Sequence, residues 1–152
     1  MEQNMDFWNA RQILLKAIRP VGTERVELSR CGGRVLAEDL EAQENIPPFD
    51  RSPYDGFAFR AADTALANKD TPVTLRILEE IPAGAVPHKE VTEGTASKVL
   101  TGSPIPHGAD AVVMYEKTHY DQHNVTIDFP VESGANIVRA GEDICKGTIL
   151  GK

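Results

Sequence analysis

Apolar and polar positions follow two different periods along the chain, and this division predicts its elements. Residues 6–19 show helical spacing, which predicts one amphipathic helix. The apolar positions that share its face are Phe7, Ala10, Leu14, Ala17 and Ile18. Asp6 suits the N-cap of this helix and Pro20 its end. We expect the helix to pack in a core and to carry no chemistry.

The segment after the helix has a less regular pattern. We expect short strands at 26–28 and 35–40, separated by a turn at 29–34 that contains a glycine pair. The pair Pro47-Pro48 then restricts the residues before it to extended geometry. Residues 45–48 are therefore predicted to form a stiff, extended linker.

From residue 49 to 135 short apolar or β-branched segments alternate with Gly/Pro turns, which predicts a small β-barrel or sandwich. The predicted strands are 73–78, 97–100, 111–115 and 125–129. Residues 119–124 are interpreted as the turn of a hairpin that joins the last two, and residues 61–69 as a short helix. Residues 148–150 predict one further strand near the C-terminal end.

Composition narrows the class of protein. Of the 152 residues, 41% are hydrophobic and 26% are charged, as in globular proteins. The net charge of -7 opposes a free nucleic-acid binder, and no apolar run approaches the length of a membrane span. Cys31 and Cys145 lack the spacing of a metal or redox motif, so we expect two free thiols in a reducing cytoplasm.

The densest polar cluster is Ser52-Pro53-Tyr54-Asp55-Gly56, which lies just before an apolar run. Asp55 on a rigid loop can hold a divalent cation or orient a polar substrate. It can equally form an Asx-turn with its own backbone ahead of Gly56. Gly56 suits a position with positive φ, or one where the backbone approaches a ligand closely.

A second cluster of the same character begins at Thr101-Gly102-Ser103. A hydroxyl at the end of a strand, followed by Gly and Ser, can offer donors to an anion, although ordinary turn chemistry favours the same residues. Both clusters adjoin hydrophobic segments. We therefore expect them to assemble one shared site.

Two other groups have simpler interpretations. Arg139 lies close to Glu142 and Asp143, and we favour an ion pair that joins two segments over a phosphate anchor. His119 and His123 have the spacing of a helical metal pair, but the residues between them favour a turn. We expect no metal there.

The chain contains three ordered blocks, PFDRSPYDGFA at 48–58, TGSPIPHGADAVV at 101–113 and NIVRAGED at 136–143. Together they resemble one known family, the MoeA molybdopterin molybdenumtransferases, which include the E domain of gephyrin. Residues 48–58, PFDRSPYDGFA, resemble its P-x-F-D-x-S-x-(M/L)-D-G-Y-A block. Residues 101–113, TGSPIPHGADAVV, resemble its T-G-A-P-x-P-x-G-A-D-A-V-V block. Residues 136–143, NIVRAGED, resemble its N-I/V-R-x-x-G-E-D block. The resemblance covers nearly the whole chain.

The resemblance implies an enzyme that inserts molybdate into adenylylated molybdopterin, releases AMP and requires Mg²⁺. It also implies an α+β, mostly β fold, in which a small β-barrel-like domain is inserted into an elongated α/β N-terminal domain. We expect the N-terminal domain to comprise residues 1–45 and 136–152, and the inserted β-rich domain to comprise residues 46–135. The pterin-binding and C-terminal β-barrel domains of the family are absent, so the chain is expected to be an inactive N-terminal fragment.

The resemblance also assigns site residues. Asp55 and Thr101 match the family's functional Asp and Thr and are the predicted catalytic residues, with Asp55 as the metal ligand. The predicted substrate-binding residues are Ser52, Gly56, Gly102, Ser103 and Arg139. A homodimer is implied, in which the pterin-binding domain of the other subunit completes the cleft. The alternative is a dimerisation or scaffolding module of gephyrin type without catalysis.

The chain departs from the family pattern at three positions. Tyr54 replaces the usual Met or Leu, and Phe57 replaces the usual Tyr and so lacks its hydroxyl. Val138 occupies the position of the first Arg of the third block, which leaves Arg139 alone there.

Overall fold

The computed structural model describes residues 5–19 and 21–152, and it divides into two compact units. One unit contains the described residues up to Asp39 together with Lys152, and the other is Leu40–Gly151. The chain is mostly β with few helices, as expected of an α+β fold. The domain boundaries at 45/46 and 135/136 stay a prediction.

The first unit contains the predicted helix, α1 (Phe7–Ala17). The Asp6 side chain caps it by accepting hydrogen bonds from the backbone N–H groups of Trp8 and Asn9, which confirms the predicted cap. The helix ends earlier than predicted, with Ile18 as C-cap, and Pro20 lies outside the described residues. No residue of α1 is buried, so the expected core packing is not found among the described residues.

The strands predicted at 26–28 and 35–40 were wrong. A 3-10 turn, η1 (Leu28–Arg30), takes the place of the first. Only the end of the second is a strand, β1 (Leu40–Glu41). Leu28 and Val35 are 86% and 90% exposed, so these apolar residues are not packed against a neighbouring strand. Apolar residues favour a strand only where such packing is available.

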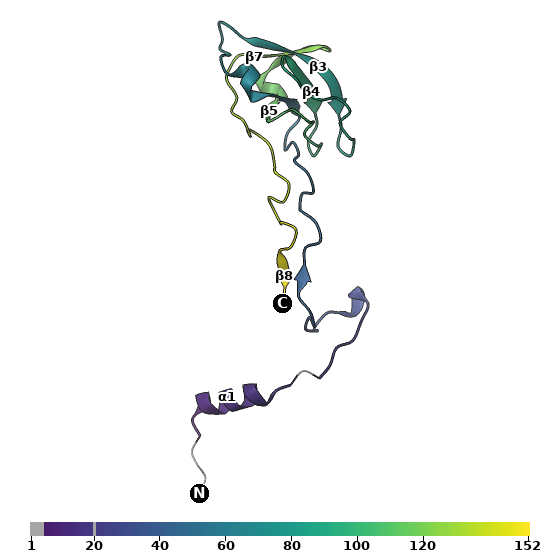
Figure 1. The fold of residues 1–152 in the computed structure, drawn as a ribbon, viewed down its shortest axis with the longest axis vertical. Coiled ribbons are helices and arrows are strands. Elements are labelled where there is room, and N and C mark those ends of the chain that lie inside the picture. The colour runs from purple at the N-terminus through teal and green to yellow at the C-terminus, as the bar shows by residue number, and fades with distance from the viewer. Residues whose placement is uncertain (1–4, 20) are drawn as a thin grey trace. The chain divides into compact units, whose positions relative to one another are not determined.

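The second unit begins and ends in a two-stranded ribbon. β1 pairs antiparallel with β8 (Ile149–Gly151), which confirms the strand predicted at 148–150. Further bridges follow at Ile46↔Ile144 and Arg51↔Val138. The segment 45–48 was predicted as an extended linker. Only Ile46 forms a β-bridge with the returning chain, whereas Pro47 and Pro48 lie in a bend that follows the cis Ile46–Pro47 peptide bond. In Figure 1 these blue and yellow arms run side by side toward the sheet.

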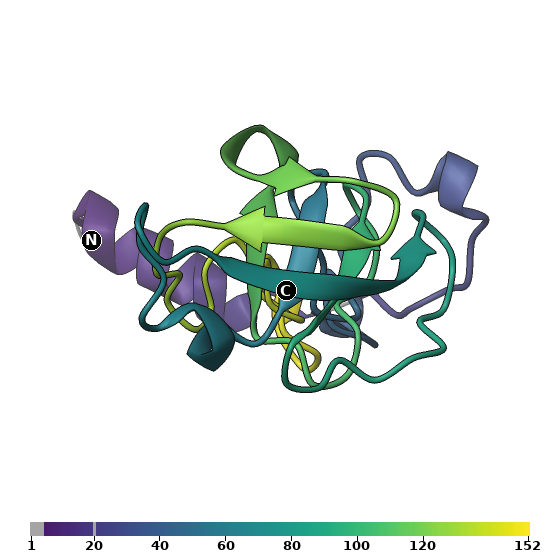
Figure 2. The ribbon, with the colours of Figure 1, turned by 90° about the horizontal axis from the view of Figure 1, so that it is seen from above.

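A six-stranded sheet forms the rest of the second unit. Its strand order is β5 (Ala111–Met114), β2 (Gly56–Phe59), β4 (Thr95–Val99), β3 (Val73–Ile81), β7 (Asn124–Ile127) and β6 (His119–Tyr120). All neighbours are antiparallel except β3 and β4. Figure 2 shows β3 in teal beside the light green β6–β7 hairpin. Short 3-10 turns, η2 (Ala61–Thr64) and η3 (Tyr115–Lys117), connect the strands.

The sheet corrects several predictions. All four predicted strands exist, but the hairpin between 111–115 and 125–129 was wrong, because β5 pairs with β2 and β7 pairs with β3. His119 and Tyr120 form a strand of their own where a turn was predicted. The helix predicted at 61–69 is only the turn η2. Strand β2, which opens at Gly56, was missed.

The sheet curls, and its two edges approach each other through aromatic rings. Tyr115, which follows edge strand β5, lies 5.3 Å from Tyr120 of edge strand β6, centroid to centroid. Both rings contact Phe57 of β2, each at 5.1 Å. Phe57 is fully buried within the main apolar cluster. The curled sheet thus forms the half-barrel that carries the candidate site.

Candidate functional site

The pairing of β2 with β4 brings the two polar loops together. The strands are antiparallel and Gly56 lies opposite Val99, so the start of β2 is beside the end of β4. Asp55 comes directly before β2 and Thr101 comes two residues after β4. The sequence separation of 46 residues is therefore bridged by one strand pair.

Asp55 and Thr101 are joined by two hydrogen bonds. The backbone N–H of Thr101 donates to Asp55 Oδ1 at 2.7 Å, and the Thr101 hydroxyl donates to the same oxygen at 2.8 Å. The predicted meeting of the two side chains is confirmed. The Asx-turn alternative is not what forms, because the Asp55 carboxylate bonds the other loop. Both residues are exposed, so a ligand can reach them.

These bonds set the charge state of the carboxylate. The backbone N–H of Thr101, followed by its hydroxyl, holds the pKa of Asp55 below its ordinary value of 3.8. The positive charge of Lys98 adds to this lowering of the pKa, while partial desolvation opposes it. Asp55 is consequently an anion at neutral pH.

The two loops that carry this pair are joined by hydrogen bonds of Ser52, Gly102 and Ser103. The Ser52 N–H donates to Ser103 O at 3.0 Å, and the Gly102 N–H donates to Ser52 O at 2.8 Å. The Ser52 hydroxyl donates to Tyr54 O at 2.6 Å. The side chains of Ser52 and Ser103 are fully buried. Direct contact of these residues with substrate stays a prediction, and their observed bonds join the two loops.

Glycine is required at position 56 for a reason that differs from the two that were predicted. Its φ is not positive, and a Cβ atom built on it would lie 2.0 Å from Val113 O of β5. The close backbone approach that requires glycine is therefore to a neighbouring strand. Gly102 does have positive φ, at 83°, which turns the chain away from β4.

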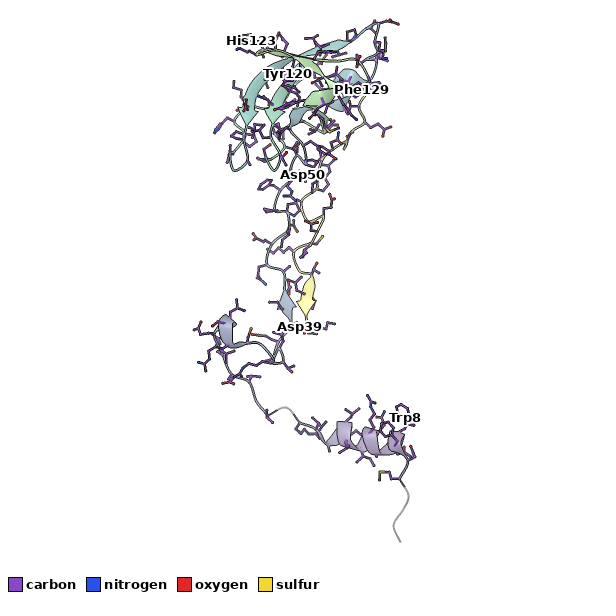
Figure 3. The ribbon with its side chains drawn as sticks, turned by 180° about the vertical axis from the view of Figure 1, so that it is seen from behind. Trp8, Asp39, Asp50, Tyr120, His123 and Phe129 are labelled. Carbon is purple, nitrogen blue, oxygen red and sulfur yellow. The ribbon has the colours of Figure 1, made fainter. Side chains whose placement is uncertain are left out.

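Arg139 forms a structural ion pair, as favoured, but its partner is a residue not predicted. Its guanidinium donates to Asp50 Oδ2 at 2.6 Å, while the Ala140 N–H donates to Asp50 Oδ1 at 2.8 Å. Glu142 instead accepts from the Arg139 N–H at 2.9 Å. Asp50 lies at the upper part of the ribbon, where the arms enter the sheet domain (Figure 3). The pair thus holds the two arms together at that point.

This contact predicts a pH-dependent stability difference. The Ala140 N–H, then the Arg139 guanidinium, hold the pKa of Asp50 below its ordinary value of 3.8. A lowered carboxyl pKa stabilises the fold above the unfolded-state value, and that stabilisation is lost as the pH falls through the folded-state pKa. We expect Asp50→Asn to cost about 1 kcal/mol at pH 7, since the pair is partly exposed. Urea unfolding at pH 7 and pH 3 measures this cost.

The difference in unfolding free energy between the native chain and Asp50→Asn should shrink at pH 3. Asp143→Asn is the control, because Asp143 is exposed and its carboxylate makes no hydrogen bond within the described residues. An Asp50→Asn cost that is equal at both pH values would contradict the ion-pair account.

Lys98, Glu80 and Tyr115 border the site and were not singled out from the sequence. The Lys98 ammonium donates to Glu80 Oε2 at 2.9 Å and lies 5.4 Å from the centre of the Tyr115 ring. Burial raises the pKa of Tyr115, and the charges of Glu80 and Asp55 raise it further. The Tyr115 N–H also donates to Asp55 O at 3.2 Å. Lys98 lies opposite Phe57 in the register of β2 and β4, and the sequence alone carries no signal for that register.

Whether the site can bind Mg²⁺ depends on the ligands that lie near Asp55. No group of three His, Cys, Asp or Glu residues in the described ranges could enclose an ion. Asp55 is nevertheless exposed, and its Oδ2 accepts no hydrogen bond from any described residue. Mg²⁺ commonly uses one or two carboxylates together with water and substrate phosphates. The site therefore fits a magnesium ion held jointly with a ligand, and not one held by this chain alone.

The remaining predictions are simple to place. His119 lies on β6 and His123 in the turn that follows, with no metal cluster among the described residues. Figure 3 shows His123 and Tyr120 at the sheet end of the second unit. Cys31 and Cys145 are free thiols, as expected. Across residues 5–19 and 21–152, no helix has the length and hydropathy of a membrane span.

The sequence matches known proteins along nearly its whole length. It is 46% identical over 132 residues to the molybdopterin molybdenumtransferase of Bacillus subtilis (strain 168), covering 84% of this chain and 31% of that protein. It is 39% identical over 149 residues to the enzyme of the same name from Synechococcus elongatus, covering 96% of this chain and 37% of that one. The chain thus spans about a third of the length of these relatives.

Solved structures agree. One crystal structure of a molybdopterin biosynthesis MoeA protein from Pyrococcus horikoshii OT3 is 47% identical, with a TM-score of 0.77 over 84% of this chain and 34% of that chain. Another from the same species is 32% identical, with a TM-score of 0.86 over 99% of this chain and 38% of the other. The family model described as the MoeA N-terminal region (domain I and II) matches residues 5–152. The chain therefore belongs to the family of the MoeA N-terminal region.

Proposed function

We propose that this chain is the N-terminal part of a molybdopterin molybdenumtransferase and supplies one wall of its active cleft. The observation that carries this proposal is the bonded pair Asp55–Thr101, which is exposed where β2 begins and β4 ends. Its two loops also carry the sequence blocks that resemble the family. The proposed role is to present an ionised carboxylate to the substrate.

The proposed reaction inserts molybdate into adenylylated molybdopterin and releases AMP. Both substrates are anionic, whereas the chain has a net charge of -7. Attraction must therefore come from local groups rather than from the net charge. Bound magnesium, held at Asp55 Oδ2 together with substrate phosphate, would supply such positive charge.

The rest of the cleft is proposed to come from outside this chain. In the proposed assembly a homodimer forms in the cytoplasm, and the pterin-binding domain of the second subunit faces the Asp55–Thr101 pair. The exposure of that pair supports this arrangement, because it leaves one side open for a partner surface. The isolated 152-residue chain is accordingly expected to show no turnover.

Substitution of Asp55 tests the function. In the full-length protein, Asp55→Asn should lower molybdate insertion at least about 100-fold, because the neutral amide no longer supplies the anion. Folding and dimerisation should persist, since Asp55 is exposed. Molybdenum cofactor formation, circular dichroism and size-exclusion chromatography measure the three properties.

Asp121→Asn is the matched control. Asp121 is also exposed, and its Oδ1 also accepts two hydrogen bonds, from the His123 and Asn124 N–H groups, but it lies in the β6–β7 turn. We expect Asp121→Asn to leave insertion within about threefold of the native rate. Native activity in Asp55→Asn, with dimerisation intact, would favour the scaffolding module instead.

A further inference from the structure

The two oxygens of the Asp55 carboxylate are not equivalent. Oδ1 accepts both hydrogen bonds from Thr101, at 2.7 and 2.8 Å. Within the described part of the chain, Oδ2 accepts none. Two donors on one oxygen fix the rotation of the carboxylate about its Cβ–Cγ bond. The second oxygen is left as the acceptor for whatever binds outside.

The outward donors of the Thr101 loop are already in use, and the Ser103 hydroxyl, which has no partner among the described residues, is buried. The Thr101 N–H and hydroxyl proton both point to Asp55, the Gly102 N–H donates to Ser52 O, and the Ser103 N–H donates to Leu100 O. A loop that receives an oxyanion needs free N–H or O–H groups directed outward. Contact of this loop with an oxyanion, as expected from the sequence, would require Asp55 to release Thr101 first.

The backbone of Asp55 is fixed as firmly as its side chain. Its carbonyl oxygen accepts the Tyr115 N–H at 3.2 Å, and the next residue, Gly56, lies tightly against Val113 of β5. Tyr115 is in turn held by ring contacts with Phe57 and Tyr120. The main chain and one carboxylate oxygen are thus both positioned before any ligand arrives, which is what a preorganised site requires.

We infer that Thr101 is a positioning residue, which turns Asp55 so that a single oxygen, Oδ2, meets a hard divalent cation. This inference rests on the proposed function and deepens it. Thr101 then does not touch the substrate, and Asp55 binds the cation through one oxygen only. A single carboxylate oxygen holds such a cation weakly unless a phosphate-bearing ligand supplies further oxygens.

Two substitutions separate positioning from direct contact. Thr101→Val has nearly the same shape but lacks the hydroxyl, and it keeps the N–H bond to Asp55. In the full-length protein at saturating Mg²⁺ we expect it to lower kcat about 10-fold with little change in KM, because Thr101 does not itself contact the substrate. Thr101→Ser restores the hydroxyl and should recover most of the loss. Thr126→Val is the control, since its hydroxyl bonds Thr74 on the sheet away from the site.

A second readout does not depend on activity. In the 152-residue chain, Mn²⁺ with inorganic phosphate serves as the probe, and broadening of backbone amide NMR signals reports where it binds. We expect broadening centred on Asp55 and Thr101 in the native chain. It should weaken at least about threefold in Thr101→Val and vanish in Asp55→Asn. Mn²⁺ without phosphate should broaden these signals far less.

Two results would overturn the inference while leaving the proposed function intact. The first is equal broadening in Thr101→Val and the native chain, with equal kcat. The second is a raised KM in both Thr101→Val and Thr101→Ser with unchanged broadening, which would mean that the Thr101 side chain touches substrate. The proposed function itself fails on a different result, namely native activity of Asp55→Asn.

Discussion

Gly56→Ala is expected to unfold the sheet domain or to reduce its free energy of unfolding by roughly 3–5 kcal/mol. The added Cβ would lie 2.0 Å from Val113 O and 2.9 Å from Val113 C. These are backbone atoms of the neighbouring strand, so no side-chain rotation can make room. Because β5 pairs with β2 along its full length, relief requires the edge strand to separate. Urea unfolding followed by circular dichroism measures the loss.

Gly32→Ala is the matched control for this steric argument. A Cβ on Gly32 meets no atom of the described residues within 4 Å, and its φ is not positive. We expect the unfolding free energy of Gly32→Ala to stay within about 0.5 kcal/mol of the native value. A Gly56→Ala chain with native stability would show that β2 and β5 do not pack as described.

Phe57→Ala is expected to cost about 3–5 kcal/mol of unfolding free energy. The Phe57 ring is fully buried in the main cluster and contacts both Tyr115 and Tyr120. Its removal leaves a cavity at the point where the two edges of the curled sheet approach. Loss of these ring contacts should also be visible as a weaker near-ultraviolet circular dichroism signal from the tyrosines.

Phe49→Ala provides the comparison within the same residue type. Phe49 is 44% exposed and directly precedes Asp50 in the sequence. We expect its removal to cost less than about 1 kcal/mol. Similar losses for Phe49→Ala and Phe57→Ala would indicate that the aromatic cluster does not hold the sheet closed.

For the six-stranded sheet, the sequence identified β3, β4, β5 and β7, missed β2 and β6, and was a poor guide to how the strands pair. The β-branched and apolar residues of segments such as 73–78 and 111–115 correctly indicated strands. Pairing depends on contacts between distant residues, and β5 joins β2 rather than the nearer β7. Strand β2 was missed because the polar loop at Ser52–Asp55 runs directly into it. The polar loop ends at Asp55 and the strand begins at the next residue, so the composition around Gly56 indicates a loop.

The candidate site shows the same division. Asp55 and Thr101 could be singled out by residue type, and their meeting followed from two similar loops beside apolar segments. The direction of their hydrogen bonds could not be predicted, because it depends on the register of β2 against β4. The position of Lys98 beside the site could not be predicted for the same reason. Which residues a strand lysine contacts depends on the strand that pairs with it.

The paired ribbon that carries the sheet domain has a mechanical consequence. Because its arms are antiparallel, Leu40 and Gly151 are partners at the same end, so tension between them opens the rungs one after another. Sequential opening yields at low force, whereas sliding two strands past each other would load all rungs at once. Under tension the two arms would therefore separate while the sheet stays folded. The Asp50–Arg139 ion pair, which lies near the sheet, would be among the last contacts of the ribbon to break.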